Sequence, residues 1–274
     1  MRLLHVSDLH FGRHSVPAQI DAIEALAHAH DFDAVVVSGD LTQRARVGEF
    51  QRAHVFLREL ARRAAVLAVP GNHDVTWWRA PFHMASPDRL YANWRRWLSR
   101  DLEPVVRLDG VTFVGLNTAQ GISHRTLTLR LRDLSVIGDL RPAQVEHARY
   151  EFAQSPSTDL RVVVMHHNPV RGDLSQRHGL KHTRRVLNAL ADAGAELVLC
   201  GHDHQEAVHL VEHTARGLVV ATAGTVSTRS RGGRPASVNV VTATASALEV
   251  AAWVWDGTAF APGPATVFER HRPA

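Results

Sequence analysis

The chain has few of the residues that form cross-links or membrane spans. Cys200 is the only cysteine among 274 residues, so an intramolecular disulfide and a zinc–thiolate cluster are excluded. Cys200 ends an apolar stretch, which predicts a buried and inert thiol. No apolar run reaches the length of a transmembrane helix, so no membrane span is expected. The acidic Asp8 comes too early for the apolar core of a signal peptide, and a cytoplasmic location is the default expectation.

Lysine is nearly absent, since Lys181 is its single occurrence. Arginine therefore carries most of the positive charge, and the formal net charge is only +4. Because the arginines are spread along the chain, a nucleic-acid partner is possible but not favoured. A hydrophobic content of 45% with 21% charged residues is typical of a globular protein.

Short apolar runs, each ending at a polar tip, alternate with helical patterns. Strands are expected at 2–7, 33–38, 65–69, 111–116, 160–165 and 196–200, and helices at 17–30, 47–63, 142–153 and 181–193. This alternation predicts an α/β fold with a mostly parallel sheet and helices outside it.

The remaining regions have a different character. After residue 206 only strand patterns follow, at 207–211, 217–223, 237–242 and 248–255, which predict a second, more antiparallel sheet. The tail 261–274 has three prolines and is expected to be irregular. The sequence predicts a single domain over 1–274, with insertions at about 75–103 and 118–141.

Polar side chains gather where the expected strands end. In an open α/β sheet the ligand lies beyond the carboxyl ends of the strands. Five such ends lead into Asp8-Leu9-His10, Gly39-Asp40, Gly71-Asn72-His73-Asp74, His166-His167-Asn168 and Gly201-His202-Asp203-His204. The sequence therefore predicts a metal site along one edge of the sheet.

The spacing of these residues indicates two ions. Residues two apart in an extended segment point to the same side, so Asp8 and His10 can hold one ion together. His202 and His204 would be roughly 6–7 Å apart, a span that suits two neighbouring metals. Asp40, with two carboxylate oxygens, suits a bridge between them. Imidazole and carboxylate ligands without thiolate favour Mn, Fe, Co or Zn over Ca or Mg.

The series resembles the calcineurin-like metallophosphoesterase family, whose pattern runs D-x-H, G-D, G-N-H-D/E, H and G-H-x-H. All elements occur in this order between residues 8 and 204. The resemblance implies a four-layer α/β/β/α sandwich of two mixed sheets flanked by helices. It also implies two divalent transition-metal ions, with Mn, Fe or Zn expected. One ion would be held by Asp8, His10, Asp40 and His204, and the other by Asp40, Asn72, His166 and His202. His73 would contact the scissile phosphate group, and Asp74 would orient His73.

Some assignments have alternatives. Adjacent strand-end residues point in opposite directions, so either His166 or His167 could be the ligand; the family uses the first, and His167 would then support it or face the substrate. Trp77, Trp78, Trp94 and Trp97 are interpreted as packing for the first insertion rather than as a base-stacking platform. Arg13, Arg44 and Arg46 follow metal-bearing strand ends and could meet a phosphate, although exposure to solvent is the more frequent outcome.

The expected activity is hydrolysis of a phosphate ester by in-line attack of a metal-bridging hydroxide. His73 would either stabilise charge on the phosphoryl oxygens or protonate the leaving alkoxide. The opening 6–11, the segment 138–144 and the end 201–205 resemble the bacterial cyclic-nucleotide phosphodiesterase branch, which implies a small phosphoester substrate such as a nucleotide.

Two departures from that branch and three alternative functions accompany this interpretation. His166-His167-Asn168-Pro169 lacks one of the two prolines that usually follow the histidines in that branch, and the insertion at 121–137 is unusual. A DNA-processing nuclease shares the style of opening but is normally longer. Hydrolases of a nucleotide-sugar lipid pyrophosphate have arginine in place of His73. A scaffold without activity is disfavoured because the ligand series is intact, and the sequence does not specify the oligomeric state.

Overall fold

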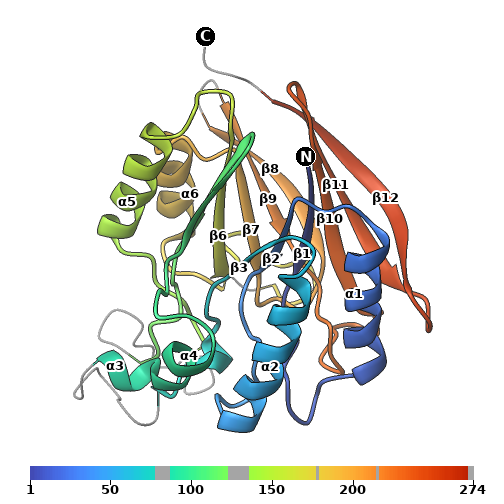
Figure 1. Ribbon diagram of the computed structural model, residues 1–274. Helices are drawn as coiled ribbons and strands as arrows, with labels where there is room; N and C mark the ends of the chain where they lie inside the picture. Colours follow the sequence, from blue (N-terminus) through green and yellow to red (C-terminus); the bar gives the residue numbers. More distant parts are fainter. Residues whose placement is uncertain (78–86, 123–135, 177–178, 214–215, 271–274) are drawn as a thin grey trace.

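The computed structural model describes residues 1–77, 87–122, 136–176, 179–213 and 216–270. Two sheets face each other in the middle of the molecule, and helices cover both outer faces (Figure 1). The architecture is thus the expected α/β/β/α sandwich of two mixed sheets. Within the described residues, no helix combines the length and apolar character needed to cross a membrane.

The first sheet contains the amino-terminal and carboxyl-terminal strands. In spatial order its strands are β12 (Phe260–Glu269), β11 (Ala247–Trp255), β10 (Ser237–Ala243), β1 (Arg2–Val6), β2 (Ala34–Val37) and β3 (Ala65–Ala68). β1, β2 and β3 are parallel, whereas β10, β11 and β12 form an antiparallel meander that pairs with β1. The carboxyl ends of the three parallel strands therefore meet at one edge.

The second sheet is parallel at its centre and antiparallel at both edges. Its order is β4 (Val105–Leu108), β5 (Val111–Gly115), β6 (Leu160–His167), β7 (Leu197–Gly201), β9 (Arg216–Thr222) and β8 (Ala207–His213). β5, β6, β7 and β9 run parallel, and β4 and β8 pair antiparallel with their neighbours.

The helices form the outer layers, and three apolar cores join the four layers. α1 (Pro17–Ala29) and α2 (Val47–Leu60) cover the first sheet, while α5 (Pro142–Ala153) and α6 (Thr183–Asp192) cover the second (Figure 1). Side chains such as Leu3 of β1 and Phe113 of β5 fill the space between the sheets. Proline opens both α1 and α5, where its missing N–H costs no helical hydrogen bond.

The described part of the first insertion, residues 75–77 and 87–103, packs against the core around α2. It contains the short helices α3 (Pro87–Leu90) and α4 (Ala92–Trp97). Trp94 is fully buried, and Trp77 and Trp97 pack against the same core, which confirms the packing interpretation for these three residues. Trp78 and most of the second insertion, residues 123–135, lie outside the described residues.

Two expectations about the carboxyl-terminal region were wrong. The strands after residue 206 do not make a sheet of their own, because β8 and β9 extend the second sheet and β10 to β12 extend the first. Residues 260–269 are also not irregular but form β12. Pro262 and Pro264 are tolerated there because β12 is an edge strand and its register with β11 shifts nearby. Beyond the strand, Arg270 donates two hydrogen bonds to the carboxylate of Glu196.

Candidate metal centre

The residues after the parallel strands leave the extended conformation at once. Among the described residues, eight non-glycine residues have positive φ, and five of these are predicted ligands: Asp8, His10, Asp40, His202 and His204. Such conformations cost of order 1–3 kcal/mol each and persist only where the surrounding structure enforces them. Asp8 and His10 thus converge through two left-handed turns, not through the strand alternation that the sequence interpretation assumed. Their backbones stay hydrogen-bonded to Gly39 and Asp40.

A first ligand group consists of Asp8, His10, Asp40 and His204, all of them buried. Nε2 of His204 lies 3.0 Å from Oδ1 of Asp8 and 3.2 Å from Nε2 of His10. Oδ1 of Asp8 is buried without a hydrogen-bond partner. Four atoms that could ligate a metal ion, one from each residue, therefore lie within 4.8 Å of one another.

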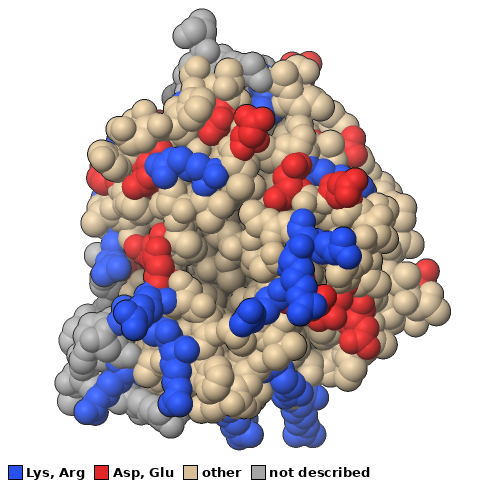
Figure 2. Space-filling view, in the orientation of Figure 1, with Lys and Arg blue, Asp and Glu red and all other residues tan. Residues whose placement is uncertain are grey.

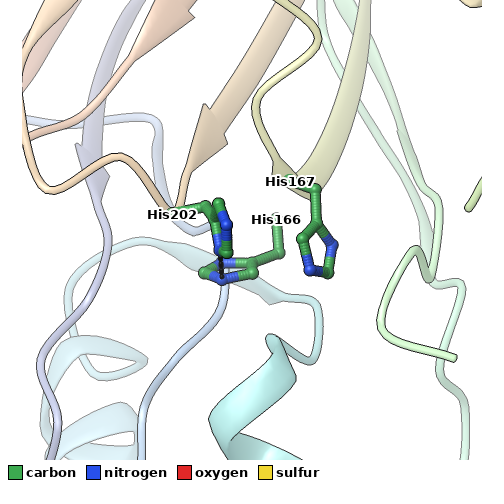
Figure 3. A group of neighbouring side chains, drawn as sticks. All are labelled: His166, His167 and His202. Carbon is green, nitrogen blue, oxygen red and sulfur yellow. Dashed lines mark hydrogen bonds between the residues drawn. The ribbon is translucent and has the colours of Figure 1, made fainter. Parts of the chain in front are cut away.

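A second ligand group consists of Asn72, His166 and His202. Oδ1 of Asn72 lies 3.1 Å from Nε2 of His166 and 3.0 Å from Nδ1 of His202. The two ring nitrogens are themselves 3.3 Å apart, and Figure 3 shows the two imidazoles directed at one another. Asn72 begins the short 3-10 helix η1 (Asn72–Asp74), which follows β3 after a tight turn at Gly71.

Asp40 lies between the two groups. Its Oδ2 is 3.8 Å from Nε2 of His10 and 3.3 Å from Nε2 of His166. Its Oδ1 accepts the backbone N–H of His73 at 2.8 Å. One carboxylate oxygen thus faces both groups while the other is fixed by the backbone.

His167 is buried next to the second ligand group but has a different partner. Its Nδ1 lies 2.8 Å from the hydroxyl of Thr118. Figure 3 shows its ring beside those of His166 and His202, with no hydrogen bond drawn to either. His166, in contrast, faces Asn72 and Asp40, but Nε2 of His167 is buried without a hydrogen-bond partner and His167 can join His166 and His202 around one ion, so the choice of His166 as the ligand stays a prediction.

Hydrogen bonds made by Nδ1 of His166 and of His204 determine that Nε2 of each ring is available as a metal ligand. Nδ1 of His166 donates to the carbonyl of Ser38 at 2.8 Å, and Nδ1 of His204 donates to the carbonyl of Arg229 at 2.9 Å. Because a carbonyl can only accept, the Nε2 atom of each neutral ring carries a lone pair. These lone pairs face the carboxylate oxygens of Asp8 and Asp40 and the amide oxygen of Asn72, and acceptors so close together repel one another unless a cation lies between them. The residues therefore fit a pair of metal ions.

The pKa shifts agree with neutral imidazoles and ionised carboxylates. Burial lowers the pKa of His10 to about 4 and of His202 to about 3. Burial opposes ionisation of Asp8, but His204 and His10 hold its pKa well below the usual value. His166 differs: burial lowers its pKa, yet Asp40 outweighs burial and raises it to about 9. A cation must therefore displace a proton from this ring.

His73 lies at the rim of the first ligand group, with its ring 4.8 Å from that of His10. Its Nδ1 donates to the carbonyl of Gln43 at 2.8 Å. Its Nε2 therefore accepts in the neutral ring, and it lies 2.9 Å from Nη1 of Arg229. The side chain of His73 is thus held at both ring nitrogens, by Gln43 and by Arg229.

Asp74 has a role other than the one expected from the sequence. Its two oxygens accept the backbone N–H groups of Leu41, Thr42 and Gly71 and the hydroxyl of Thr42. The ring of His73 is oriented by Gln43 instead. Asp74 thus ties the turn after β3 to the segment after β2, and burial together with Asp40 raises its pKa.

Of the arginines considered from the sequence, Arg13, Arg44 and Arg46 are exposed. The sequence interpretation missed Arg229, whose guanidinium contacts both His73 and His10. Arg229 follows β9, which runs parallel to β7, and the sequence did not reveal this because residues 217–223 were expected in a more antiparallel sheet. Basic side chains also flank a hollow in the face drawn in Figure 2.

Known proteins resemble this chain in sequence and in fold. The sequence model of the family described as calcineurin-like phosphoesterase matches residues 1–206. Two curated relatives, from Escherichia coli strain K12 and Escherichia coli O157:H7, are named 3',5'-cyclic adenosine monophosphate phosphodiesterase CpdA. Each is 26% identical over 222 residues, which cover 75% of this chain and 70% of the relative.

Among solved structures, the purple acid phosphatase PPD1 from yellow lupin superposes with a TM-score of 0.72. The match covers 98% of this chain and 54% of the lupin protein, at 10% sequence identity. At that identity the likeness concerns the fold alone.

Proposed function

Because the chain belongs to the calcineurin-like phosphoesterase family, we propose that it is a dinuclear-metal hydrolase of phosphodiesters, with cyclic nucleotides as the favoured substrates. The family assignment supports phosphoester hydrolysis in general. The preference for diesters, the substrate and the ligand assignments are the parts proposed here.

The position of Asp40 carries the proposal. Its Oδ2 faces a histidine of each ligand group, at 3.8 Å from His10 and 3.3 Å from His166. A carboxylate shared in this way brings two cations close together, as in enzymes that clamp both oxygens of a displacement at phosphorus. Asp8, His10 and His204 would complete one site, and Asn72, His166 and His202 the other.

When bound, the two ions would supply Lewis-acid polarisation of the phosphoryl group and activation of water at neutral pH. The protein's own residues position the substrate. His73, fixed by Gln43, presents Nε2 toward the rim of the first ligand group, where it can meet a phosphoryl oxygen or the leaving group. Asp74 keeps the His73 turn in place through its backbone contacts.

The substrate class rests on the curated relatives. Both are named for hydrolysis of 3',5'-cyclic adenosine monophosphate, and the match covers most of either chain. A cyclic nucleotide is a small, singly charged phosphodiester, and two dications with only two carboxylates leave a positive centre that attracts such an anion.

A substrate screen tests the proposal. Manganese-loaded protein should hydrolyse cyclic mononucleotides and an aryl diester faster than an aryl monoester, a UDP-sugar lipid or single-stranded DNA. A matched preparation of Asp40→Asn should be inactive toward every substrate. Preference for the monoester or the lipid would reject the diester assignment, and preference for single-stranded DNA would identify a nuclease instead.

A further inference from the structure

Arg229 is built into the framework that carries the first ligand group. It lies in the loop between β9 and β10, beyond the carboxyl end of a strand parallel to β7. Its backbone N–H donates to the hydroxyl of Ser227 at 3.2 Å. Its carbonyl accepts Nδ1 of His204, a proposed ligand, at 2.9 Å. The backbone of Arg229 is therefore fixed relative to the metal centre on both sides.

The rest of this loop is attached to the segment after β1. The buried Thr225 donates its hydroxyl to the carbonyl of Asp8 at 2.8 Å. The N–H of Thr228 donates to the carbonyl of His14 at 2.9 Å, and the side chains of the same two residues are 3.0 Å apart. A loop with this many anchors holds its side chains in defined positions, as a binding site requires.

The guanidinium of Arg229 lies at the side of the first ligand group, against His10 and His73. Its Nη1 lies 2.9 Å from Nε2 of His73 and 3.4 Å from both ring nitrogens of His10. Within the described part of the chain, Arg229 forms no ion pair with a carboxylate. Its guanidinium contacts these two imidazoles, and its backbone contacts Ser227 and His204. This permanent cation thus contacts two imidazole rings, and no carboxylate among the described residues forms an ion pair with it.

Loading of the two metal ions would make this position unfavourable for a bare cation. His10 would then direct its lone pair to a metal, and the guanidinium would lie beside two dications. Repulsion between charges of one sign is relieved when an anion lies between them. A phosphate group in that place would accept hydrogen bonds from the guanidinium on one side and contact the metals on the other.

We propose that Arg229 binds a non-bridging oxygen of the substrate phosphate group, together with the metal pair and His73. The proposal rests on the function proposed above and extends it to a residue outside the ligand series. The planar guanidinium suits this role because its charged N–H groups match the spacing of phosphate oxygens.

Neighbouring arginines in the loop provide matched controls. Arg231 donates from Nε to the carbonyl of Asp203 at 2.7 Å, so its side chain is engaged elsewhere. Arg234 forms an exposed ion pair with Glu206 at 3.0 Å. An Arg234→Gln variant therefore removes the same charge from the same loop without touching the metal centre.

The test measures metal content and binding of inorganic phosphate, by elemental analysis and by calorimetry on manganese-loaded protein. Arg229→Gln should retain two metals and bind phosphate roughly 10- to 100-fold more weakly, because a charge-assisted hydrogen bond to the anion is lost. Arg229→Lys should recover part of the affinity, and Arg234→Gln should behave as the unmodified protein.

Two results would overturn the inference. One is Arg229→Gln protein with two metals and unchanged phosphate affinity. The other is loss of metal from both Arg229 variants, which would assign the arginine to maintenance of the site. Failure of the unmodified protein to bind two metals would instead reject the proposed function, so the two failures are distinguishable.

Discussion

Nε2 of His10 and Nε2 of His204 lie 3.2 Å apart, although 194 residues separate the two histidines in the chain. Nδ1 of His204 donates to Arg229, so its Nε2 is an acceptor directed at another imidazole nitrogen. The same Nε2 lies 3.0 Å from Oδ1 of Asp8, which is also an acceptor when ionised, and two buried acceptors in contact destabilise a protein unless a shared cation or proton lies between them. The two histidines therefore lie at a place where a bound positive charge stabilises the folded protein.

Metal content is the first consequence. Purified protein should contain close to two transition-metal equivalents, because each ligand group offers enough donors for one ion. A chelator should abolish phosphoesterase activity and manganese should restore it. Elemental analysis and a turnover assay check both points, and a metal-free preparation with full activity would contradict the prediction.

Removal of the shared carboxylate should affect both ions. Asp40→Ala should lose close to two metal equivalents, because Oδ2 of Asp40 faces both groups. His202→Ala, which removes a donor of the second ligand group alone, should retain about one equivalent. Metal analysis of the two variants side by side makes the comparison; normal stoichiometry and turnover in Asp40→Ala would exclude a bridging role.

His73 should act in chemistry and not in metal retention. His73→Ala should keep two metals and lose roughly 10²–10⁴-fold in kcat, the range for a lost proton donor or charge-stabilising group. If His73 protonates the leaving group, the loss should be far smaller with an acidic nitrophenol than with a ribose alkoxide. Equal losses indicate stabilisation of phosphoryl charge, and an unchanged kcat on both substrates would remove His73 from the site.

Gly71 should be irreplaceable for steric reasons. A Cβ at this position would collide with the backbone N and Oδ1 of Asp40 and lie 2.8 Å from its Cγ. Gly71→Ala should therefore displace Asp40, reduce metal content and destabilise the fold by about 1–3 kcal/mol. Gly48→Ala is the control, because a Cβ there meets nothing within 4 Å and the residue lies in α2.

For Gly48→Ala the expected change is a gain of about 0.5–1 kcal/mol, since alanine favours the helix. Denaturant unfolding and metal analysis of both glycine variants check the pair. A Gly71→Ala protein with two metals and unchanged stability would show that the close approach to Asp40 is dispensable.

His5 should make the protein sensitive to mild acid. Burial lowers its pKa from 6.5 to about 3, and the ring is hydrogen-bonded to Ser38 in the core. Below pH 6.5 His5 binds a proton in the unfolded chain, whereas in the folded state it stays neutral until the pH falls to about 3. Stability should therefore fall as the pH falls through this window, by at most about 1.4 kcal/mol per pH unit from this group.

His5→Gln removes that proton while keeping hydrogen-bonding groups for Ser38. In chelator, the free energy of unfolding of the variant should decline less steeply than that of the unmodified protein between pH 6 and pH 4. Urea unfolding at several pH values measures the two slopes, and identical slopes would mean that His5 is protonated in the folded state.

The sequence alone predicted most of the elements and the place of the candidate site. Apolar runs predicted the strands of both sheets except β4 and β12, and periodic patterns predicted α1, α2, α5 and α6. β12 was not predicted because Pro262 and Pro264 disfavour a strand unless it lies at the edge of a sheet, and the sequence does not show which strand lies at an edge. Ligand types and their places at strand ends were local information, so the series from Asp8 to His204 could be read directly.

Only the tertiary structure decided which atoms meet. The positive φ angles of Asp8, His10 and Asp40 depend on neighbouring strands that enforce them; aspartate and histidine adopt such angles more often than most residues, but their presence alone does not predict them. Asp74 accepts hydrogen bonds from the backbone of Leu41 and Thr42 and not from His73. Arg229 contacts His73 although the two residues are 156 positions apart in the chain. Such contacts depend on how two sheets pack, and a local pattern carries no record of distances between segments that are far apart in the chain.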